Sequence, residues 1–223
     1  MSFLDLVFPK KCVGCGREGF YLCTCCKSKI ILVRQPFCPA CHKLTPGGQY
    51  CSRCRPHFAL TGVLIAAHYD SPLKEAVQSS KYQKIHTLYE ELIDLLLKRF
   101  QLGLPRGKLL FCPVPLYLSR QSARGFNQAQ FLTKPLASEL DINVLQGLER
   151  IKNTTSQTKL SQKKRFENVK DAFQFNGDKS KVYGKTILLV DDVITTGATL
   201  SSAAIPLLAA GARNVWGVVL AKR

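Results

Sequence analysis

The segment Ile187–Thr199, which reads ILLVDDVITTGAT, carries the clearest structural signal in this chain of 223 residues. Its first four residues are branched and apolar, which is typical of a strand buried on both faces. Two acids, Asp191 and Asp192, follow, and a short turn rich in threonine then leads into an apolar stretch. A strand, a turn and a helix in this order favour an α/β fold, in which the turn lies at the carboxyl end of a parallel strand.

The turn has the chemistry of an anion site. The first amides of a helix, together with the helix dipole, favour a phosphate, and Gly197 allows the backbone to approach it closely. Asp191 and Asp192 would lie beside that phosphate, where carboxylates accept hydrogen bonds from ribose hydroxyls or hold Mg2+ through water. The phosphate-binding residues expected from the turn are Thr195, Thr196, Gly197, Ala198 and Thr199. Because no Gly-Lys-Ser/Thr sequence follows, the segment is not a Walker A loop.

Strand-like and helix-like patterns alternate over most of the chain and predict an α/β fold with a mostly parallel sheet flanked by helices. The expected strands are Val63–Tyr69, Leu109–Val114, Val144–Ile151, Ala172–Phe175, Thr186–Val190 and Asn214–Leu220. The expected helices are Leu73–Tyr82, Thr87–Phe100, Phe126–Leu140 and Ala198–Ala210. Pro135 should kink or break the third helix, and Pro206 should disturb the fourth.

Nine of the ten cysteines precede residue 57, and eight of them form four CxxC pairs. Two such pairs can supply the four thiolates of a closed, structural zinc site, so the pattern predicts two zinc ions. The expected ligands are Cys12, Cys15, Cys23, Cys26, Cys38, Cys41, Cys51 and Cys54. Consecutive pairing of the CxxC turns is favoured over crossed pairing because its loops are shorter.

Alternatives to this ligand set remain at three positions. Cys25 is a rival to Cys23, and His42 or His57 could replace a cysteine. The tenth cysteine, Cys112, stands apart and is interpreted as a small core residue.

Composition suggests two parts and a basic surface. The cysteine-rich module spans residues 1–57, and the α/β domain spans residues 58–223. The formal charge is +17, and Lys98–Leu136 holds seven basic residues and no acid, which suits a polyanionic ligand. No stretch is long and apolar enough for membrane insertion, and no signal peptide is recognisable, so we expect a cytoplasmic protein whose cysteines are reduced.

Several motifs together support a resemblance to a known family. Ile187–Thr199 resembles the signature with which type I phosphoribosyltransferases bind 5-phosphoribosyl-1-pyrophosphate (PRPP). The PVP motif at Pro113–Pro115, the RGFNQ motif at Arg124–Gln128, and the stretch Ile151–Phe173 resemble the ComF family, whose longer members also carry four CxxC pairs. The resemblance covers nearly the whole chain. It implies a type I phosphoribosyltransferase fold behind a zinc module, and an association with competence, the import of transforming single-stranded DNA.

The resemblance also assigns roles to residues. Asp191 and Asp192 resemble the ribose-binding pair, and the stretch Lys152–Arg165 resembles the hood loop that closes over PRPP. The pyrophosphate loop would be Pro113, Val114 and Pro115, and the groups that neutralise pyrophosphate would be Arg120, Arg124, Lys152 and Arg165. Asn127 of the RGFNQ motif joins the PRPP-binding set, and Mg2+ would accompany PRPP. For Arg124 and Asn127, a purely structural role at a helix start is the alternative.

Three functions are open from the sequence. The first is an active phosphoribosyltransferase with an unknown acceptor. The second is a non-catalytic PRPP or nucleotide sensor that serves DNA import by binding single-stranded DNA or DNA-uptake proteins. The third is a scaffold in which the zinc module and the sheet mediate only protein contacts.

Overall fold

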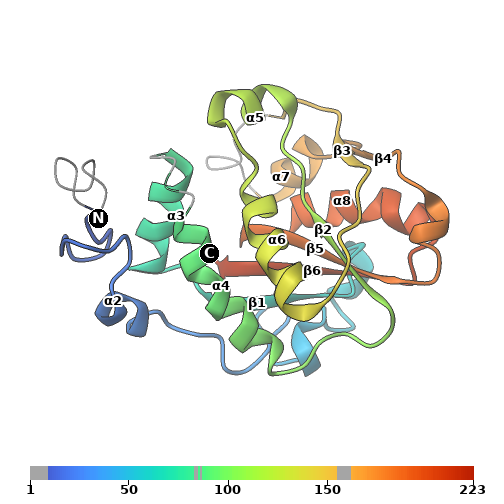
Figure 1. Cartoon of the computed structure of the whole chain (residues 1–223). Coiled ribbons are helices and arrows are strands. Elements are labelled where there is room, and N and C mark those ends of the chain that lie inside the picture. The colour runs from blue at the N-terminus through green and yellow to red at the C-terminus, as the bar shows by residue number, and fades with distance from the viewer. Residues whose placement is uncertain (1–9, 83–84, 86, 155–161) are drawn as a thin grey trace.

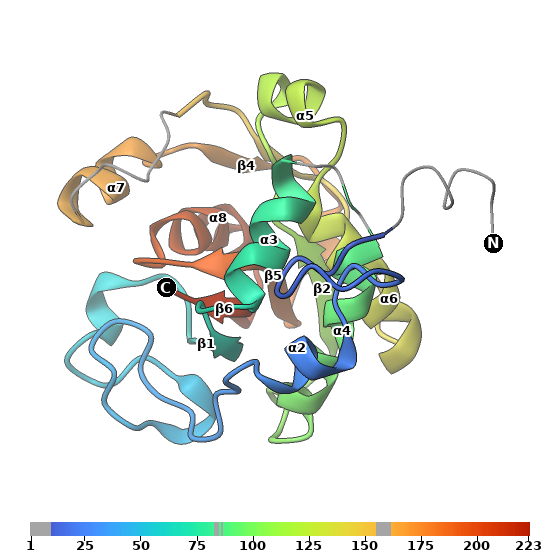
Figure 2. The same ribbon diagram turned by 90° about the vertical axis from the view of Figure 1, so that its left-hand side faces the viewer.

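Four parallel strands form the central sheet of the computed structural model, which describes residues 10–82, 85, 87–154 and 162–223 (Figure 1). Their order across the sheet is β1 (Gly62–His68), β6 (Asn214–Lys222), β5 (Thr186–Ile194) and β2 (Leu109–Pro113). Every neighbouring pair is parallel, as the alternation of strands and helices predicted. All carboxyl ends therefore meet at one edge of the sheet, which Figure 2 shows facing the viewer.

Helices cover both faces of this sheet. On one face, the apolar side of α8 (Ala198–Ala209) packs on the odd-numbered core residues of β5, such as Ile187 and Leu189. On the other face, α3 (Leu73–Tyr82), α4 (Thr87–Phe100) and α6 (Gln128–Leu140) pack against Leu188 and Val190. Because successive strand residues point to opposite faces, the continuous apolar run of β5 serves both layers.

Shorter elements complete the fold. A separate antiparallel pair consists of β3 (Leu148–Arg150) and β4 (Phe173–Phe175). Other helices among the described residues are α2 (Thr24–Ser28), α5 (Leu118–Arg124), α7 (Gln162–Asn168) and the 3-10 turns η1 (Pro46–Gly48), η2 (Arg55–His57) and η4 (Lys179–Lys181).

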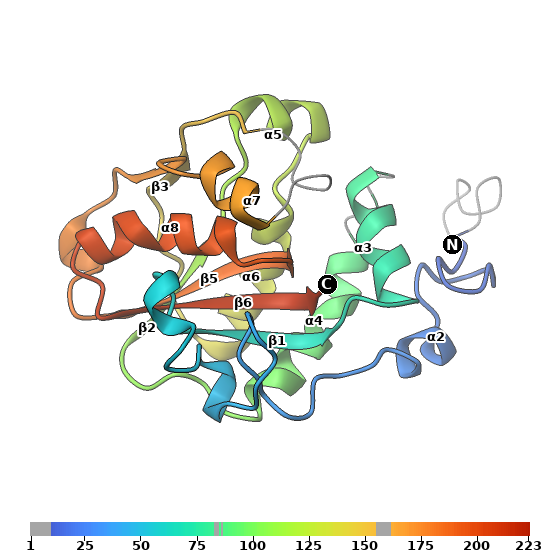
Figure 3. The same cartoon turned by 180° about the vertical axis from the view of Figure 1, so that it is seen from behind.

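The two CxxC-containing knuckles pack on opposite faces of the sheet. The first, residues 12–26, joins the core beneath α3 and α4, whereas the second, residues 38–54, joins the core beneath α8. The linker between them runs antiparallel along β1, where Val33 donates its amide to Ala66 and Ile31 accepts from His68. Figure 3 shows the knuckles at separate places, the first near α3 and the second beside β1. The domain boundary expected near residue 57 stays a prediction. Both knuckles pack into the same hydrophobic cores as the sheet.

Some expected elements differ from those observed. The strand expected over Val144–Ile151 is wrong in extent: Val144 forms one bridge with Phe111, and the chain then turns at Gly147, whose φ is +98°, before β3 begins. The helix α6 is not broken at Pro135, because buried Leu132 and Leu136 hold it against the sheet. Nor does Pro206 interrupt α8. The helix α5 was not expected.

Candidate functional site

A cavity of about 270 Å³ opens beside the carboxyl end of β5. Its wall includes Asp191 and, from the turn that follows the strand, Thr195, Gly197, Ala198 and Thr199. Basic side chains on the same wall are Lys81, Arg165 and Arg223. The structure thus brings one of the two acids and four residues of the expected phosphate loop to a single cavity with a positive rim.

The loop has the backbone form that its sequence suggests. The strand β5 continues to Ile194, and α8 begins at Ala198. Gly197 has φ +82°, a conformation that residues with a Cβ rarely adopt, and no side chain caps the helix from this position. Thr196 does not line the cavity, and its hydroxyl accepts a long hydrogen bond (3.4 Å) from the Ala198 amide. Lys222 donates to the Thr195 carbonyl at 2.6 Å, which fixes the outer side of the loop.

The two acids lie in different surroundings. Asp191 is half-buried on the cavity wall, and its Oδ1 accepts a local hydrogen bond from the Asp192 amide at 2.9 Å. Burial, followed by the neighbouring Asp192 carboxylate, raises the pKa of Asp191 to about 7. Asp192 is 5% exposed and does not line the cavity. Its Oδ2 forms an ion pair with Lys81 Nζ at 2.5 Å and accepts a hydrogen bond from Tyr89 Oη at 3.3 Å.

Lys81 and Tyr89 seal Asp192 from the helices α3 and α4. Burial opposes the charge on Lys81, but the Asp192 carboxylate outweighs it, and the pKa of Lys81 is raised. Burial also raises the pKa of Tyr89, which therefore stays a neutral donor. Sequence reasoning missed both residues, because neither forms a motif and both lie far from Asp192 in the chain.

The four basic residues expected at pyrophosphate lie in different places. Arg165 lines the cavity, and Arg124 ends α5 just before the left-handed Gly125. Arg120 donates to the carbonyl of Thr154. Lys152 is exposed, donates to the Lys170 carbonyl at 3.0 Å and does not line the cavity. The middle of the expected hood loop, residues 155–161, lies outside the described residues.

The RGFNQ and PVP motifs are joined by one side chain. Asn127 is buried, accepts from the Ala129 amide at 3.1 Å as the N-cap of α6, and donates to the Val114 carbonyl at 3.0 Å. Val114 in turn donates its amide to Val190 of β5. Pro113 ends β2, and Pro115 follows the buried Val114. Both polar ends of the Asn127 amide are therefore engaged by the protein.

A further arginine, Arg150, was missed by sequence reasoning. It is 9% exposed, its guanidinium lies over the Phe173 ring at 5.3 Å, and it donates to Thr154 Oγ1 at 2.5 Å. Its Nε has no hydrogen-bond partner within the described ranges. Burial, followed by Arg120, lowers its pKa, whereas the Asp191 carboxylate acts in the opposite sense. The signal available in the sequence was an arginine at an inward-facing position of β3, two residues after the buried Leu148.

The eight CxxC cysteines form two groups in the consecutive pairing. In each group the four sulfur atoms lie within 4.8 Å of one another. Cys15 Sγ and Cys23 Sγ are 3.7 Å apart, and Cys41 Sγ and Cys51 Sγ are 3.6 Å apart. Tetrahedral zinc with bonds of about 2.3 Å needs sulfur–sulfur distances of about 3.8 Å, so both groups fit structural zinc. The prediction of consecutive pairing is confirmed, with Cys25, His42 and His57 outside both groups.

Local amides favour the thiolate form of Cys12 in the first group and of Cys38 in the second. Burial opposes ionisation of Cys12, but amides such as that of Cys23, 3.4 Å from its sulfur, outweigh it and lower its pKa to about 6. In the second group, burial is similarly outweighed by backbone amides, which lower the pKa of Cys38 to about 7. Cys112 differs, because burial raises its pKa to about 12, as expected for a small core residue.

The chain matches two known domains. Residues 3–55 match the double zinc ribbon domain, and residues 128–223 match the phosphoribosyl transferase domain. The sequence is 34% identical to competence protein F of Haemophilus influenzae, over 96% of this chain and 98% of that protein. The chain belongs to the competence protein F family. Its type I phosphoribosyltransferase fold and its double zinc ribbon are thereby confirmed.

Other relatives agree with this membership. The DNA utilization protein YhgH of Escherichia coli is 31% identical over 87% of each chain. Competence protein ComFC of Bacillus subtilis is 28% identical over 85% of this chain and 79% of that protein. Within the described ranges, no helix combines the length and the apolar character that crossing a bilayer requires.

Proposed function

We propose that the cavity beside β5 binds PRPP, and that the protein transfers the phosphoribosyl group to an acceptor during DNA import or nucleotide metabolism. One observation carries the proposal: Asp191 and four residues of the loop, Thr195, Gly197, Ala198 and Thr199, share a single cavity at the carboxyl end of a parallel sheet. In this assignment the loop binds the 5′-phosphate, and Asp191 accepts hydrogen bonds from the ribose hydroxyls. Asp192, sealed by Lys81, acts by fixing the end of the strand.

The residues near Asp191 fit Mg2+ with PRPP. Mg2+ is usually held by one or two carboxylates together with substrate phosphates, and Asp191 offers one half-buried carboxylate on the cavity wall. When bound, the ion would neutralise charge on the pyrophosphate oxygens.

Basic side chains of the chain itself support departure of the leaving group. As the bond between C1′ and the pyrophosphate oxygen breaks, negative charge grows on pyrophosphate and positive charge grows on the ribose. Preorganised donors aimed at developing charge usually make the largest catalytic contribution. Arg165 on the cavity wall, and Arg120 and Arg150 around Thr154, are assigned to the anion. We assign Arg124 and Lys152 to the outer approach to the site.

Calorimetry with PRPP tests this function. We expect binding that requires Mg2+, and release of pyrophosphate when the right base, amine or DNA acceptor is present. Binding without turnover, after a screen of all three acceptor classes, would favour the sensor. Absence of PRPP binding with and without Mg2+ would overturn the assignment.

A second function, binding of single-stranded DNA, is favoured by the opposite end of the sheet. Basic residues stand immediately before three strands: Lys108 before β2, Lys185 before β5 and Arg213 before β6. Backbone hydrogen bonds from Thr186 to Lys108 and from Arg213 to Lys185 hold these loops side by side. A polyanion could therefore bind here while PRPP occupies the carboxyl end.

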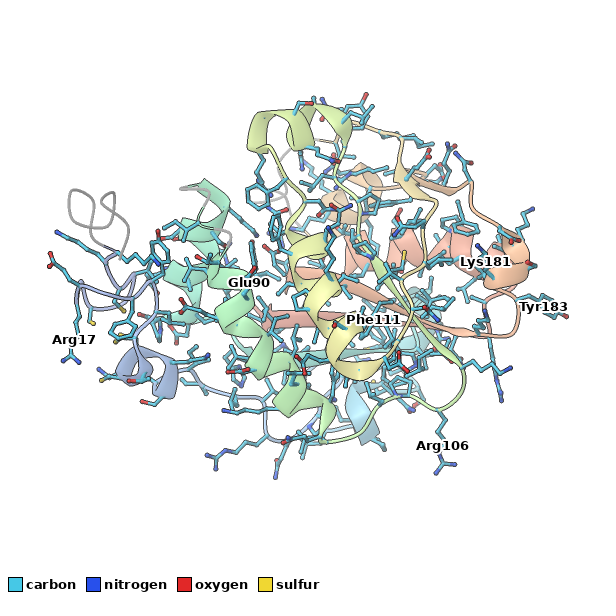
Figure 4. All side chains as sticks on the ribbon, viewed as in Figure 1. Arg17, Glu90, Arg106, Phe111, Lys181 and Tyr183 are labelled. Carbon is cyan, nitrogen blue, oxygen red and sulfur yellow. The ribbon has the colours of Figure 1, made fainter. Side chains whose placement is uncertain are left out.

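An exposed aromatic ring lies among these charges. Tyr183 is 77% exposed, and Figure 4 shows it projecting from the same end of the molecule as Lys181 and Arg106. Bases stack on exposed aromatic rings in many proteins that bind single strands. Oligonucleotide binding should therefore weaken steeply with salt, and should weaken further in Tyr183→Ala than in Tyr183→Phe. A flat salt response would exclude this function. We place both functions in the cytoplasm, where the cysteines stay reduced.

A further inference from the structure

The second zinc knuckle lies directly beneath the phosphate loop. The rings of Tyr50 and Phe58 are stacked, with centroids 4.1 Å apart. A Cβ built on Gly197 would come within 2.7 Å of Tyr50 Oη and 3.4 Å of Phe58 Cε1. The glycine that gives the loop its shape therefore packs against an aromatic pair, of which Tyr50 belongs to the second knuckle and Phe58 follows it in the chain.

Additional contacts tie this pair to α8 and to the cavity wall. The amide of Ala59, next to Phe58, donates to Ser201 Oγ at 2.9 Å, in the first turn of α8. The Phe58 ring also meets Phe166 edge-on at 5.5 Å, one residue after the cavity-lining Arg165. The segment that follows the second knuckle thus links Tyr50 to the support of the loop at two further points.

Tyr50 is positioned by the zinc ligands around it. It precedes Cys51 in the chain and shares a buried cluster with Cys38. It is 4% exposed, and its hydroxyl has no hydrogen-bond partner within the described residues. The Tyr50 ring is therefore held against the underside of the loop by packing and not by a hydrogen bond, so a shift of this ring reaches Gly197 directly.

The first knuckle has no such contact among the described residues. A Cβ on Gly14 would come within 2.9 Å of Pro72 Cβ, so this knuckle meets the chain just before α3. Its cysteines belong to the core on the opposite face of the sheet from α8. The two zinc sites therefore have the same ligands but different neighbours, the chain before α3 for the first and the phosphate loop for the second.

We propose that zinc in the second site, held by Cys38, Cys41, Cys51 and Cys54, strengthens binding of the ligand's 5′-phosphate, and that Tyr50 transmits this coupling to Gly197. The inference rests on the proposed PRPP site. Zinc binding and folding of a small knuckle are one process, so loss of this ion releases Tyr50 and Phe58 from beneath the loop. Thermodynamic linkage requires the reverse as well: a ligand in the loop must tighten the second zinc by the same factor.

Two probes separate the ends of the ligand. Ribose 5-phosphate carries the 5′-phosphate that the loop is proposed to bind. Inorganic pyrophosphate has no 5′-phosphate and tests the pyrophosphate position alone. In Tyr50→Leu we expect the Kd of ribose 5-phosphate, measured by calorimetry with both zinc ions bound, to rise about tenfold, within the usual range of coupling between sites. The Kd of pyrophosphate should stay within a factor of about two. Tyr50→Phe, which keeps the ring, should retain most of the affinity.

Tyr21 provides a matched control, since it is a tyrosine of the first knuckle that packs in the other core. Tyr21→Leu should leave both Kd values unchanged. An equal loss of affinity for both probes in Tyr50→Leu, or the same loss in Tyr21→Leu, would overturn the coupling and indicate a general folding defect.

Release of zinc to a chelator gives the reciprocal readout. Ribose 5-phosphate should slow release of one zinc ion and leave the other unaffected, and this slowing should vanish in Tyr50→Leu. Cys15→Ser, which weakens the first site, identifies the unaffected phase. If the wild-type protein binds ribose 5-phosphate but releases both ions at unchanged rates, the coupling is wrong while the PRPP site stands. If the wild-type protein binds no phosphate ligand, the proposed PRPP site itself is wrong.

Discussion

The two faces of β5 treat neighbouring carboxylates in opposite ways. Beneath α3 and α4, Asp192 is sealed, and Lys81 and Tyr89 meet its hydrogen-bonding needs. Beneath α8, Asp191 opens onto the cavity, Lys81 forms its ion pair with Asp192 instead, and burial and Asp192 raise the pKa of Asp191 to about 7. The difference indicates that Asp192 contributes to stability and that Asp191 is available to a ligand.

The same contrast separates two other polar side chains. Asn127 uses both ends of its amide within the protein. The Arg150 Nε has no hydrogen-bond partner within the described residues, and burial and Arg120, opposed by Asp191, lower the pKa of the buried guanidinium. Polar groups with partners inside the protein should contribute to stability. Polar groups that lack such partners should contribute to ligand binding. Each prediction below tests one member of these pairs.

The largest effect is expected from Lys81→Met. The substitution leaves Asp192 buried without its counter-charge, and breaking a buried ion pair on one side typically costs about 3–5 kcal/mol. Urea unfolding should show a loss of about 3 kcal/mol in the free energy of unfolding. The double variant Lys81→Met/Asp192→Asn should recover part of this loss, because no buried charge remains. No recovery, or a loss below about 1 kcal/mol, would mean that the pair is not structural.

Asp191→Asn should weaken ligand binding without lowering stability. Because a charge-assisted hydrogen bond contributes about 1.5–3 kcal/mol, affinity for Mg2+ and PRPP should fall by about tenfold to a hundredfold in calorimetry. The free energy of unfolding should rise, because repulsion between Asp191 and Asp192 is relieved. Asp192→Asn, the matched change one residue later, should instead lower stability. If the two variants behave alike, the contrast between the two faces is wrong.

Much of the fold was predictable because local patterns and tertiary packing agree. The strand at β5 and the helix α4, with Leu88, Leu92 and Leu96 all buried, follow directly from apolar spacing. The CxxC pairs predicted both metal groups, since four thiols at short spacing can converge on one ion. The strand expected over Val144–Ile151 was too long, because apolar composition does not reveal a turn that depends on close contact between Gly147 and Gly177.

The site was predictable only where it is continuous in the chain. The loop after β5 contains its own signal, so most of its residues and Asp191 were placed together in advance. Contacts between distant segments left no local trace: Lys81 meets Asp192 from α3, and Tyr50 meets Gly197 from the zinc module. Lys152 could not be distinguished from Arg150 by charge alone, because β-strand alternation determines that Arg150 points inward.

A moderate effect is expected from Arg150→Met. If the guanidinium serves an anion, its removal should raise the Kd of inorganic pyrophosphate about tenfold, the loss of about one charge-assisted hydrogen bond. The free energy of unfolding should not fall, because a buried and incompletely paired charge costs stability. Arg150→Lys keeps the charge without the planar fork and should bind at an intermediate level. A large loss of stability with unchanged pyrophosphate affinity would assign Arg150 to the structure alone.

The smallest effect is expected from Asn127→Ala. The substitution removes the N-cap of α6 and the hydrogen bond to the Val114 carbonyl, and loss of such a cap typically costs about 1 kcal/mol. Asn127→Asp retains the cap but cannot donate to Val114, so urea unfolding of the two variants separates the two contributions. Affinity for PRPP should change less than threefold or so in Asn127→Asp, within about 0.6 kcal/mol. A loss as large as that of Asp191→Asn, in a variant as stable as the wild type, would place Asn127 among the ligand-binding groups and would break the rule that satisfied side chains serve only the fold.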